Sequence, residues 1–544
     1  MKFFVVCPRG LEIPLFEEIQ AILEQSQSES TLKELGLDPK HIQTLAHCFD
    51  HAAIGAMPIK PTGGIEISGG LELAMLINLY SRIASRVLLQ LSHTTYKKEE
   101  DIYVQASRIS WEDWFVPEQT LRVDVTAQKS GLNSINFITL RIKDAICDRF
   151  RDLAGKRPSI ETATPDVRVM AFLDPTHLTL YLDTSGEALF KRGWRDEKGA
   201  APLKENLAAG ILHLTGWQAH QPLFDPMCGS GTFLIEAAQI AKAIPPGAIR
   251  AGILQPQIPH EPIHQEVPKP APIIETNFEV KIEPATPSSW AAPIAVETGQ
   301  MIQSPKNKPL PKPLLANAQP PRAIPAVTFK PTRVDLVGTV QGFGFQRLKP
   351  FQEKSIATHW ALLKTLAQQQ MQAHAGKTLR IAGSDIHEQM VKITQRNWQR
   401  AGLPGLPIVR QIDALVTKSP FGEMKMTGVL LFNPPYGERI DLKGGRGGDE
   451  DKKMRGARDP LPKNISDPAL IEFLAQYGRH LKEQFQGWQV DVLTADMGLP
   501  GQLRMKETKR TPLFNGAIEC RLFRFEIRGI QPENHELSQG LKQD

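Results

Sequence analysis

The segment Phe224–Thr232 constrains the fold of this chain more than any other, because it joins four features in a fixed order. A short apolar strand is followed by an acid, Asp225, then by a turn that contains Gly229 and Gly231, and then by an apolar helical run. This succession is typical of the first strand–turn–helix crossing of a doubly wound parallel sheet, where cofactors bind. The glycines let a ligand approach the backbone, and a helix N-terminus follows.

The same turn departs from the two common nucleotide-binding signatures. No third glycine stands where a dinucleotide fold needs one, and no Gly-Lys-Ser/Thr follows for a triphosphate. An acid at the strand end fits a cation better than a pyrophosphate, and S-adenosylmethionine carries an ammonium and a sulfonium. We therefore expect S-adenosylmethionine as the cofactor and no metal in the site. The cofactor-binding residues expected in this segment are Asp225, Cys228, Gly229, Ser230, Gly231 and Thr232.

A second motif, Asn433-Pro434-Pro435-Tyr436, follows the apolar run 428–432 and indicates chemistry on an exocyclic amine. An amide oxygen and a backbone carbonyl can accept both N–H donors of such an amine while its lone pair attacks a methyl group, and Tyr436 would stack on the base. The alternative is a turn in which proline merely ends a strand. We expect Asn433, Pro434, Pro435 and Tyr436 to be the catalytic residues, because the glycine-rich turn upstream favours that interpretation.

Taken in order, these motifs resemble class I S-adenosylmethionine-dependent methyltransferases, and within them the bacterial THUMP-containing 23S rRNA guanine-N2 methyltransferases. No single block is diagnostic, but their order is specific and covers most of the chain outside two inserts. The resemblance implies an α/β, doubly wound Rossmann-like methyltransferase domain preceded by an α+β ferredoxin-like and THUMP region that binds RNA. The blocks that carry it are Cys7–Glu12, Lys191–Arg195, Ala201–Glu205, Asp225–Thr232, Asn433–Arg439 and Asn515–Cys520.

Two further acids follow expected strands. Asp385 follows the strand expected at 379–384, where a carboxylate can accept both ribose hydroxyls, although aspartate also caps helices there. For Asp413, after the strand expected at 408–412, the resemblance implies contact with the adenine amino group of the cofactor. A turn aspartate is the alternative.

The amino-terminal half predicts an α+β succession. We expect helices at 13–27, 71–89 and 139–154, strands at 167–173 and 178–183, and an irregular segment at 28–62. In the family that the chain resembles, this region binds structured RNA, so basic residues here are candidate backbone contacts; a solvated basic face is the alternative. The candidates are Lys129, Arg141, Lys143, Lys156 and Arg157.

Two inserts interrupt the family pattern. The first is proline-rich and is expected to be extended and disordered, at little cost because each doubling of a loop adds only about 0.6 kcal/mol. The second is rich in glycine, lysine and arginine and follows the Pro-Pro-Tyr motif, so we expect it to touch RNA near the target base; an inert polar loop is the alternative. The expected division is 1–65 ferredoxin-like part, 66–184 THUMP domain, 185–250 with 335–530 methyltransferase domain, 251–334 and 441–464 inserts, and 531–544 tail.

Composition agrees with an RNA-modifying enzyme of the cytoplasm. Five scattered cysteines without a CxxC pair indicate a reducing compartment and neither a disulfide framework nor structural zinc. No apolar run is long enough to span a membrane, and the net charge of +5 is compatible with nucleic acid. Because the chain ends soon after its last expected strand, we expect no second methyltransferase domain of the kind that larger family members carry.

The expected reaction is direct transfer of a methyl group from S-adenosylmethionine to the N2 amine of a guanine. The substrate would be 23S rRNA or the assembling large ribosomal subunit, and the choice of guanine rests on the resemblance alone. Three alternatives stay open: an adenine-N6 DNA methyltransferase, a protein glutamine methyltransferase, and a non-catalytic RNA-binding assembly factor.

Overall fold

The computed structural model describes residues 1–57, 62–132, 134–195, 203–256, 342–421, 427–434 and 468–528. The chain divides into two compact units, and all of the described residues belong to the unit formed by 1–260 and 337–544. Pro435, Tyr436, the insert expected at 441–464 and the tail expected at 531–544 lie outside the described residues, as does the insert expected at 251–334 from residue 257 onward.

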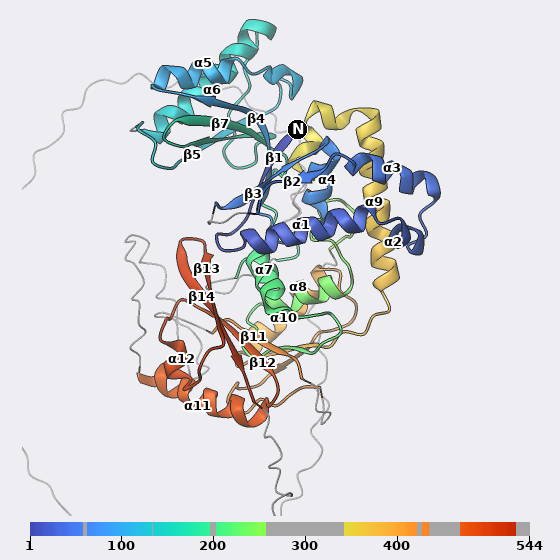
Figure 1. Cartoon of the computed structure of the whole chain (residues 1–544), viewed down its shortest axis with the longest axis vertical. Coiled ribbons are helices and arrows are strands. Elements are labelled where there is room, and N and C mark those ends of the chain that lie inside the picture. Colours follow the sequence, from blue (N-terminus) through green and yellow to red (C-terminus); the bar gives the residue numbers. More distant parts are fainter. Residues whose placement is uncertain are drawn as a thin grey trace, which may run out of the picture. The chain divides into compact units, whose positions relative to one another are not determined.

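Two seven-stranded sheets organise the described unit (Figure 1). The strands are β1 Lys2–Val6, β2 Ala53–Ile54, β3 Gly64–Ser68, β4 Arg86–Thr95, β5 Leu121–Ala127, β6 Val167–Leu173, β7 His177–Asp183, β8 Leu223–Asp225, β9 Ile381–Asp385, β10 Ile408–Gln411, β11 Val429–Phe432, β12 Gln489–Thr494, β13 Lys509–Asn515 and β14 Ile518–Glu526. The helices are α1 Glu12–Gln27, α2 Glu29–Glu34, α3 Pro39–Phe49, α4 Leu71–Tyr80, α5 Glu99–Ser107, α6 Ile135–Ala154, α7 Glu205–Thr215, α8 Thr232–Ala241, α9 Lys354–His374, α10 Glu388–Arg400, α11 Pro468–Gln484 and α12 Leu499–Gln502, with 3-10 turns at Trp111–Asp113, Gly344–Arg347 and Lys349–Gln352.

The first sheet, sheet A, has the order β2-β3-β1-β4-β7-β6-β5 and is antiparallel except for the pair β5–β6. Its strands hydrogen-bond continuously from β2 to β5, and the boundary expected between residues 65 and 66 falls inside β3. Helices α5 and α6 pack together over the half of the sheet that contains β5 (Figure 1). The expected α+β region is therefore built on one continuous sheet.

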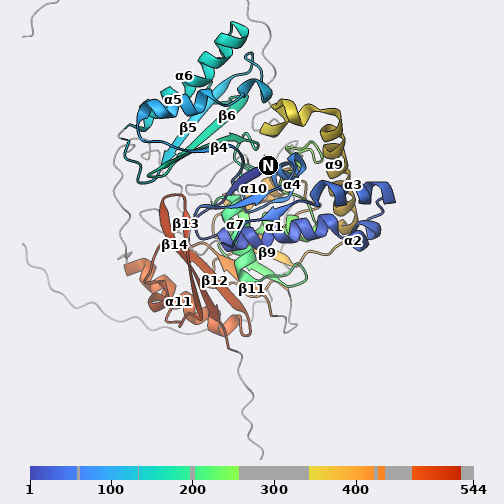
Figure 2. The same cartoon turned by 45° about the horizontal axis from the view of Figure 1, so that its top comes forward.

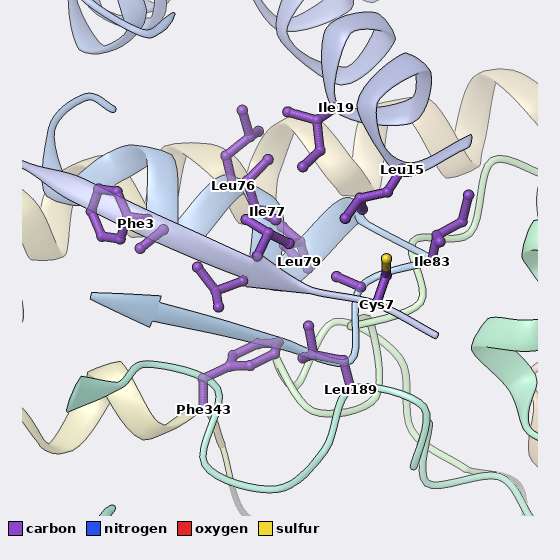
Figure 3. Packing of buried hydrophobic residues seen from close by; sticks show 14 of the residues in the cluster. Phe3, Cys7, Leu15, Ile19, Leu76, Ile77, Leu79, Ile83, Leu189 and Phe343 are labelled. Atoms are coloured by element: carbon purple, nitrogen blue, oxygen red, sulfur yellow. The ribbon is translucent and has the colours of Figure 1, made fainter. Parts of the chain in front are cut away.

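An apolar core fills the space between β1 and the helices α1 and α4. Alternate residues of β1 are buried, as a strand with one covered face requires. Figure 3 shows side chains of β1, α1 and α4 converging, with two residues from later in the chain packed nearby. The labelled members are Phe3, Cys7, Leu15, Ile19, Leu76, Ile77, Leu79, Ile83, Leu189 and Phe343. Every one of them is at least nine-tenths buried.

The second sheet, sheet B, has the order β10-β9-β8-β11-β12-β14-β13. The first five strands are parallel, and β14 runs antiparallel to β12 and β13. Crossings lie on both sides of β8, so the strand order reverses there, which is where doubly wound sheets bind ligands. The predicted α/β doubly wound domain is confirmed. The parallel strands β8, β9, β10 and β11 all end at one edge, which we call the carboxyl edge of sheet B.

Two expectations for the amino-terminal half were wrong. The segment 28–62 contains helices α2 and α3, which begin where Ser28 and Asp38 accept hydrogen bonds from backbone N–H groups three residues later. Serine and aspartate are preferred at helix N-caps, so these two residues could have indicated the starts of the helices. The helix expected at 71–89 ends at Tyr80, and β4 begins at Arg86 and pairs with β1.

The reason for the early end of α4 is a long-range contact. Glu18 of α1 accepts a hydrogen bond from the Ser81 hydroxyl at 2.5 Å and one from the Arg82 N–H at 2.8 Å. A carboxylate from another helix thus holds the turn that replaces the next helical turn. Local apolar spacing could not reveal this partner, because it comes from 63 positions earlier in the chain.

A buried charge cluster ties α8 to the segments before it. Glu236 of α8 has a fully buried side chain and pairs with Arg192 at 3.2 Å and with Arg82 at 3.3 Å. Buried charges are retained only when they are paired in this way. Within the described ranges, no helix is both long and apolar enough to cross a membrane.

Candidate functional site

Asp225 stands at the carboxyl end of β8 and is almost completely buried. Its Oδ1 accepts a hydrogen bond from the Met227 N–H at 3.1 Å, which orients the carboxyl group. Burial raises the pKa of Asp225 well above its ordinary value, and the nearby charge of Asp385 raises it further. A carboxyl group held in this way gains most from a positively charged ligand, because a neighbouring cation restores the ionised form.

The glycine-rich turn is fixed between β8 and β9 by backbone contacts. The Cys228 N–H donates to the Ser384 carbonyl at 2.9 Å, and the Gly229 N–H donates to Asp385 Oδ2 at 2.9 Å. Gly229 and Gly231 have φ values of +53° and +80°, which only glycine adopts readily. A Cβ at Gly229 would meet no atom within 4 Å, so this side of the turn is open to a ligand.

Helix α10 holds the turn through two side-chain hydrogen bonds that the sequence did not reveal. Thr394 Oγ1 donates to the Gly229 carbonyl at 2.8 Å, and Asn397 Nδ2 donates to the Ser230 carbonyl at 3.1 Å. Both side chains are fully or nearly fully buried. Two buried polar residues three positions apart in an otherwise amphipathic helix were the available signal.

Arg195 is a third residue that was not among the site residues expected from the sequence. Its guanidinium donates to Ser230 Oγ at 3.1 Å and to Thr232 Oγ1 at 2.7 Å. It also donates to Glu205 Oε1 at 2.7 Å and to the Leu203 carbonyl at 3.1 Å, and its side chain is only 8% exposed. Arg195 therefore fastens the start of α7 to the start of α8. Ser230 and Thr232 serve as acceptors for this arginine.

The acids at the next two strands lie where the sequence predicted. Asp385 is the last residue of β9. Its Oδ2 accepts a hydrogen bond from the Gly229 N–H, and its Oδ1 accepts one from the His387 N–H at 3.0 Å. Asp413 follows β10, and its Oδ1 accepts a hydrogen bond from the Leu415 N–H at 2.9 Å. Asp385 is thus joined to the glycine-rich turn, whereas Asp413 is partly exposed and closes a local turn.

Asn433 directly follows β11, next to β8 in the sheet. Its Oδ1 is buried, and among the described residues no donor reaches it. A buried acceptor without a partner is costly unless a ligand supplies the donor. Pro434 is buried beside it. Tyr477 of α11 packs its ring edge-on against Phe432, the last residue of β11, with ring centroids 5.6 Å apart.

Cys228 is buried within the turn, and burial together with the charges of Asp225 and Asp385 raises the pKa of its thiol well above the ordinary value. A thiol whose ionisation is disfavoured is a poor nucleophile. Its geometry suits a small packing residue of the turn.

The candidate RNA contacts belong to the region of β5 and α6 and not to the carboxyl edge of sheet B. Three of the five are engaged with acids: Lys143 with Asp144, Lys156 with Glu118, and Arg157 with Asp148. The Arg141 guanidinium lies over the Phe137 and Tyr103 rings, and Lys129 is exposed with φ of +57°.

Two family models match the chain. The model described as RMKL-like, methyltransferase domain, matches residues 192–308 and 317–446, and the THUMP domain model matches residues 96–183. The first match contains the glycine-rich turn, the strand-end acids and Asn433.

Curated relatives extend over most of the chain. A ribosomal RNA large subunit methyltransferase K/L of Psychromonas ingrahamii is 30% identical over 87% of this chain, and that of Allochromatium vinosum is 29% identical over 90%. The alignments cover 47% and 51% of these relatives, so the chain spans about half of their length. A protein of Synechocystis named as an RNA methyltransferase is 27% identical over 87% of this chain and 91% of its own length.

Solved structures share the fold. SMU.472, a protein assigned as a methyltransferase and crystallised with SAH, has 20% identity and a TM-score of 0.59, covering 97% of this chain and 99% of its own. A predicted N6-adenine-specific DNA methylase from Listeria monocytogenes has 20% identity and a TM-score of 0.59, covering 96% and 95%. The chain therefore contains a THUMP domain followed by an RMKL-like methyltransferase domain, the two domains that the family models describe.

Proposed function

We propose that this chain transfers the methyl group of S-adenosylmethionine to the exocyclic N2 amine of a guanine in 23S rRNA. The observation that carries the proposal is the buried, unpartnered Oδ1 of Asn433 at the carboxyl edge of sheet B. An exocyclic amine supplies the hydrogen-bond donor that this oxygen lacks. The relatives named as ribosomal RNA large subunit methyltransferases support RNA as the substrate.

The residues present fit S-adenosylmethionine. Asp225 offers a buried carboxyl group for a cation, and Gly229 leaves an open side on the turn. Asp385, which accepts a hydrogen bond from the Gly229 N–H, is the proposed partner of the ribose. Asp413 is the proposed partner of the adenine. When bound, the cofactor supplies an electrophilic methyl group on sulfur. SMU.472, which shares this fold, was crystallised with SAH, and this supports S-adenosylmethionine as the cofactor.

The chain itself positions the acceptor. Asn433 Oδ1 and the Pro434 carbonyl are proposed to accept the two N–H donors of the amine, so that its lone pair is directed at the methyl group. We propose that Tyr436 stacks on the base, beside Pro435. Because the amine becomes acidic once methylated, no strong general base is required. The THUMP region is proposed to hold the RNA through its phosphates, with Lys129, Arg141, Lys143, Lys156 and Arg157 as candidates.

The test is transfer of labelled methyl groups to 23S rRNA that lacks its native modifications, followed by nucleoside digestion and mass spectrometry. We expect N2-methylguanosine, with free rRNA and assembling large subunits compared as substrates. Asn433→Ala should lower turnover by about 10²–10³-fold, the usual cost of one preorganised polar group, while cofactor affinity changes little. The matched control is Asn515→Ala at the end of β13, which leaves the motif intact.

Other outcomes would redirect the assignment. Methylated adenine in DNA, or methylated glutamine in a protein, would replace the proposed substrate while leaving the role of Asn433 in place. Full turnover by Asn433→Ala would refute that role. Failure to bind S-adenosylmethionine would favour a non-catalytic RNA-binding factor.

A further inference from the structure

A sulfur, a carboxylate and an imidazole meet on three helices away from the motifs of the methyltransferase site. Cys48 lies in α3, Glu72 in α4 and His359 in α9, and one donor atom of each lies within 4.8 Å of the others. In the part of the chain that the structure describes, this is the one group of three such residues close enough to hold a metal ion. Nothing in the proposed methyl transfer uses any of the three.

The geometry points to a zinc site formed by Cys48, Glu72 and His359, with water as the fourth ligand. Zinc accepts mixed sulfur, nitrogen and oxygen ligands in tetrahedral geometry, at about 2.3 Å for sulfur and about 2.0–2.2 Å for nitrogen and oxygen. These lengths place ligand atoms roughly 3.4–3.6 Å apart. The present separations would therefore change by no more than about 1.2 Å on binding, which side-chain rotation can supply.

The carboxylate is already held in place for this role. Glu72 Oε1 lies 2.8 Å from His359 Nδ1, and the Glu72 side chain is only 12% exposed. Gly70 makes room for the other oxygen, because a Cβ there would lie 2.5 Å from Glu72 Oε2. Around zinc a carboxylate often orients a metal-binding histidine through its other ring nitrogen. In the proposed site Glu72 would instead exchange its contact with His359 for a bond to the ion.

The surroundings are negatively charged. The carboxylates of Glu72 and Asp50 both place negative charge near the Cys48 thiol. A divalent cation bound there would offset this charge. No hydrogen bond to the Cys48 sulfur is found within the described ranges, so a metal would displace no partner of the sulfur.

The ion would connect parts of the chain that are far apart in sequence. Helix α9 packs against α3 and α4, and Figures 1 and 2 both show it beside α3. Cys48 and His359 are more than 300 positions apart, and α9 leads directly into β9 of the methyltransferase sheet. Zinc here would fasten α9, and with it the entry to β9, to the amino-terminal helices.

The test uses the full chain, stripped with a chelator and titrated with zinc against a chromophoric competitor. We expect one zinc per chain, and with cobalt in its place a near-ultraviolet absorption band from thiolate coordination. Cys48→Ser and Glu72→Gln should each weaken zinc binding by about 100-fold or more. Cys147→Ser and His374→Ala are control variants, since Cys147 is a free cysteine outside the group and His374 is another histidine of α9.

A second readout separates binding from folding. Added zinc should raise the midpoint of thermal unfolding of the wild-type chain and leave that of Cys48→Ser unchanged, while both bind S-adenosylhomocysteine equally. A wild-type chain that takes up no zinc, or a Cys48→Ser variant that binds zinc as tightly as the wild type, would overturn the proposal. Glu72 and His359 would then be an ordinary hydrogen-bonded pair that docks α9.

Discussion

Gly231→Ala tests whether the glycine-rich turn is held by helix α10. Gly231 has φ of +80°, and a Cβ there would lie 2.5 Å from Thr394 Cγ2 and 3.0 Å from Thr394 Oγ1. The left-handed conformation alone costs alanine about 1–2 kcal/mol. Displacing a packed side chain adds about 1–3 kcal/mol, so the total should be about 2–5 kcal/mol. Thr394 would also be pushed away from the Gly229 carbonyl that it now holds.

Gly229→Ala is the matched control, because its φ is +53° but a Cβ would meet no atom within 4 Å. Gly229→Ala should lower the free energy of unfolding only by the cost of the left-handed conformation, about 1–2 kcal/mol. Its methyl group would instead occupy the open side of the turn, so cofactor affinity should fall at least about tenfold, the effect of roughly 1.4 kcal/mol. The two variants thus separate a stability defect at Gly231 from a binding defect at Gly229.

The assays are thermal unfolding of the cofactor-free chain and calorimetric titration with S-adenosylhomocysteine. Since a chain with two sheets need not unfold in two states, hydrogen exchange at residues 228–232 should accompany the thermal measurement. Thr394→Ser removes the methyl group that is 2.5 Å from the added Cβ. The double variant with Gly231→Ala should therefore be more stable than the sum of the single changes predicts. Equal stability of the two glycine variants, or strict additivity with Thr394→Ser, would refute the reasoning.

Two further predictions concern charges at the site. Arg195→Ala should destabilise the chain by about 3–5 kcal/mol, because it leaves the buried carboxylate of Glu205 unpaired. Adding Glu205→Gln should recover part of the lost stability, measured by thermal unfolding. No recovery would contradict this account. Because the pKa of Asp225 is raised in the folded chain, the folded state binds more protons between the ordinary and the raised value, and stability of the cofactor-free chain should fall as pH rises through that interval. Asp225→Asn should flatten this dependence of stability on pH. Cofactor binding to the wild type should release a proton, which calorimetry in buffers of different ionisation enthalpy detects, and Asp225→Asn should abolish that release. An unchanged pH profile of stability in Asp225→Asn would show that another group is responsible.

The sequence alone determined the doubly wound sheet and the positions of its strand-end residues. Apolar runs that end in Asp225, Asp385 and Asn433 are local patterns, and parallel strands bring their carboxyl ends to one edge without further information. Gly229 and Gly231 were readable for the same reason, since a positive φ is a property of one residue. The resemblance to THUMP-containing methyltransferases rested on the order of these motifs, and the two matching domain models confirm both expected domains.

The tertiary structure decided where α4 ends and what holds the glycine-rich turn and the starts of α7 and α8, because the residues responsible lie elsewhere in the chain. Glu18 ends α4 from another helix, Thr394 supports a turn 165 positions earlier, and Arg195 joins the starts of two helices. Cys48 and His359 came together through α3 and α9, whereas cysteine spacing had argued against zinc. Each of these arrangements includes a contact between residues at least 37 positions apart, so no local period or spacing encodes it. The local pattern fixed which residues end each strand, and long-range packing fixed what holds them in place.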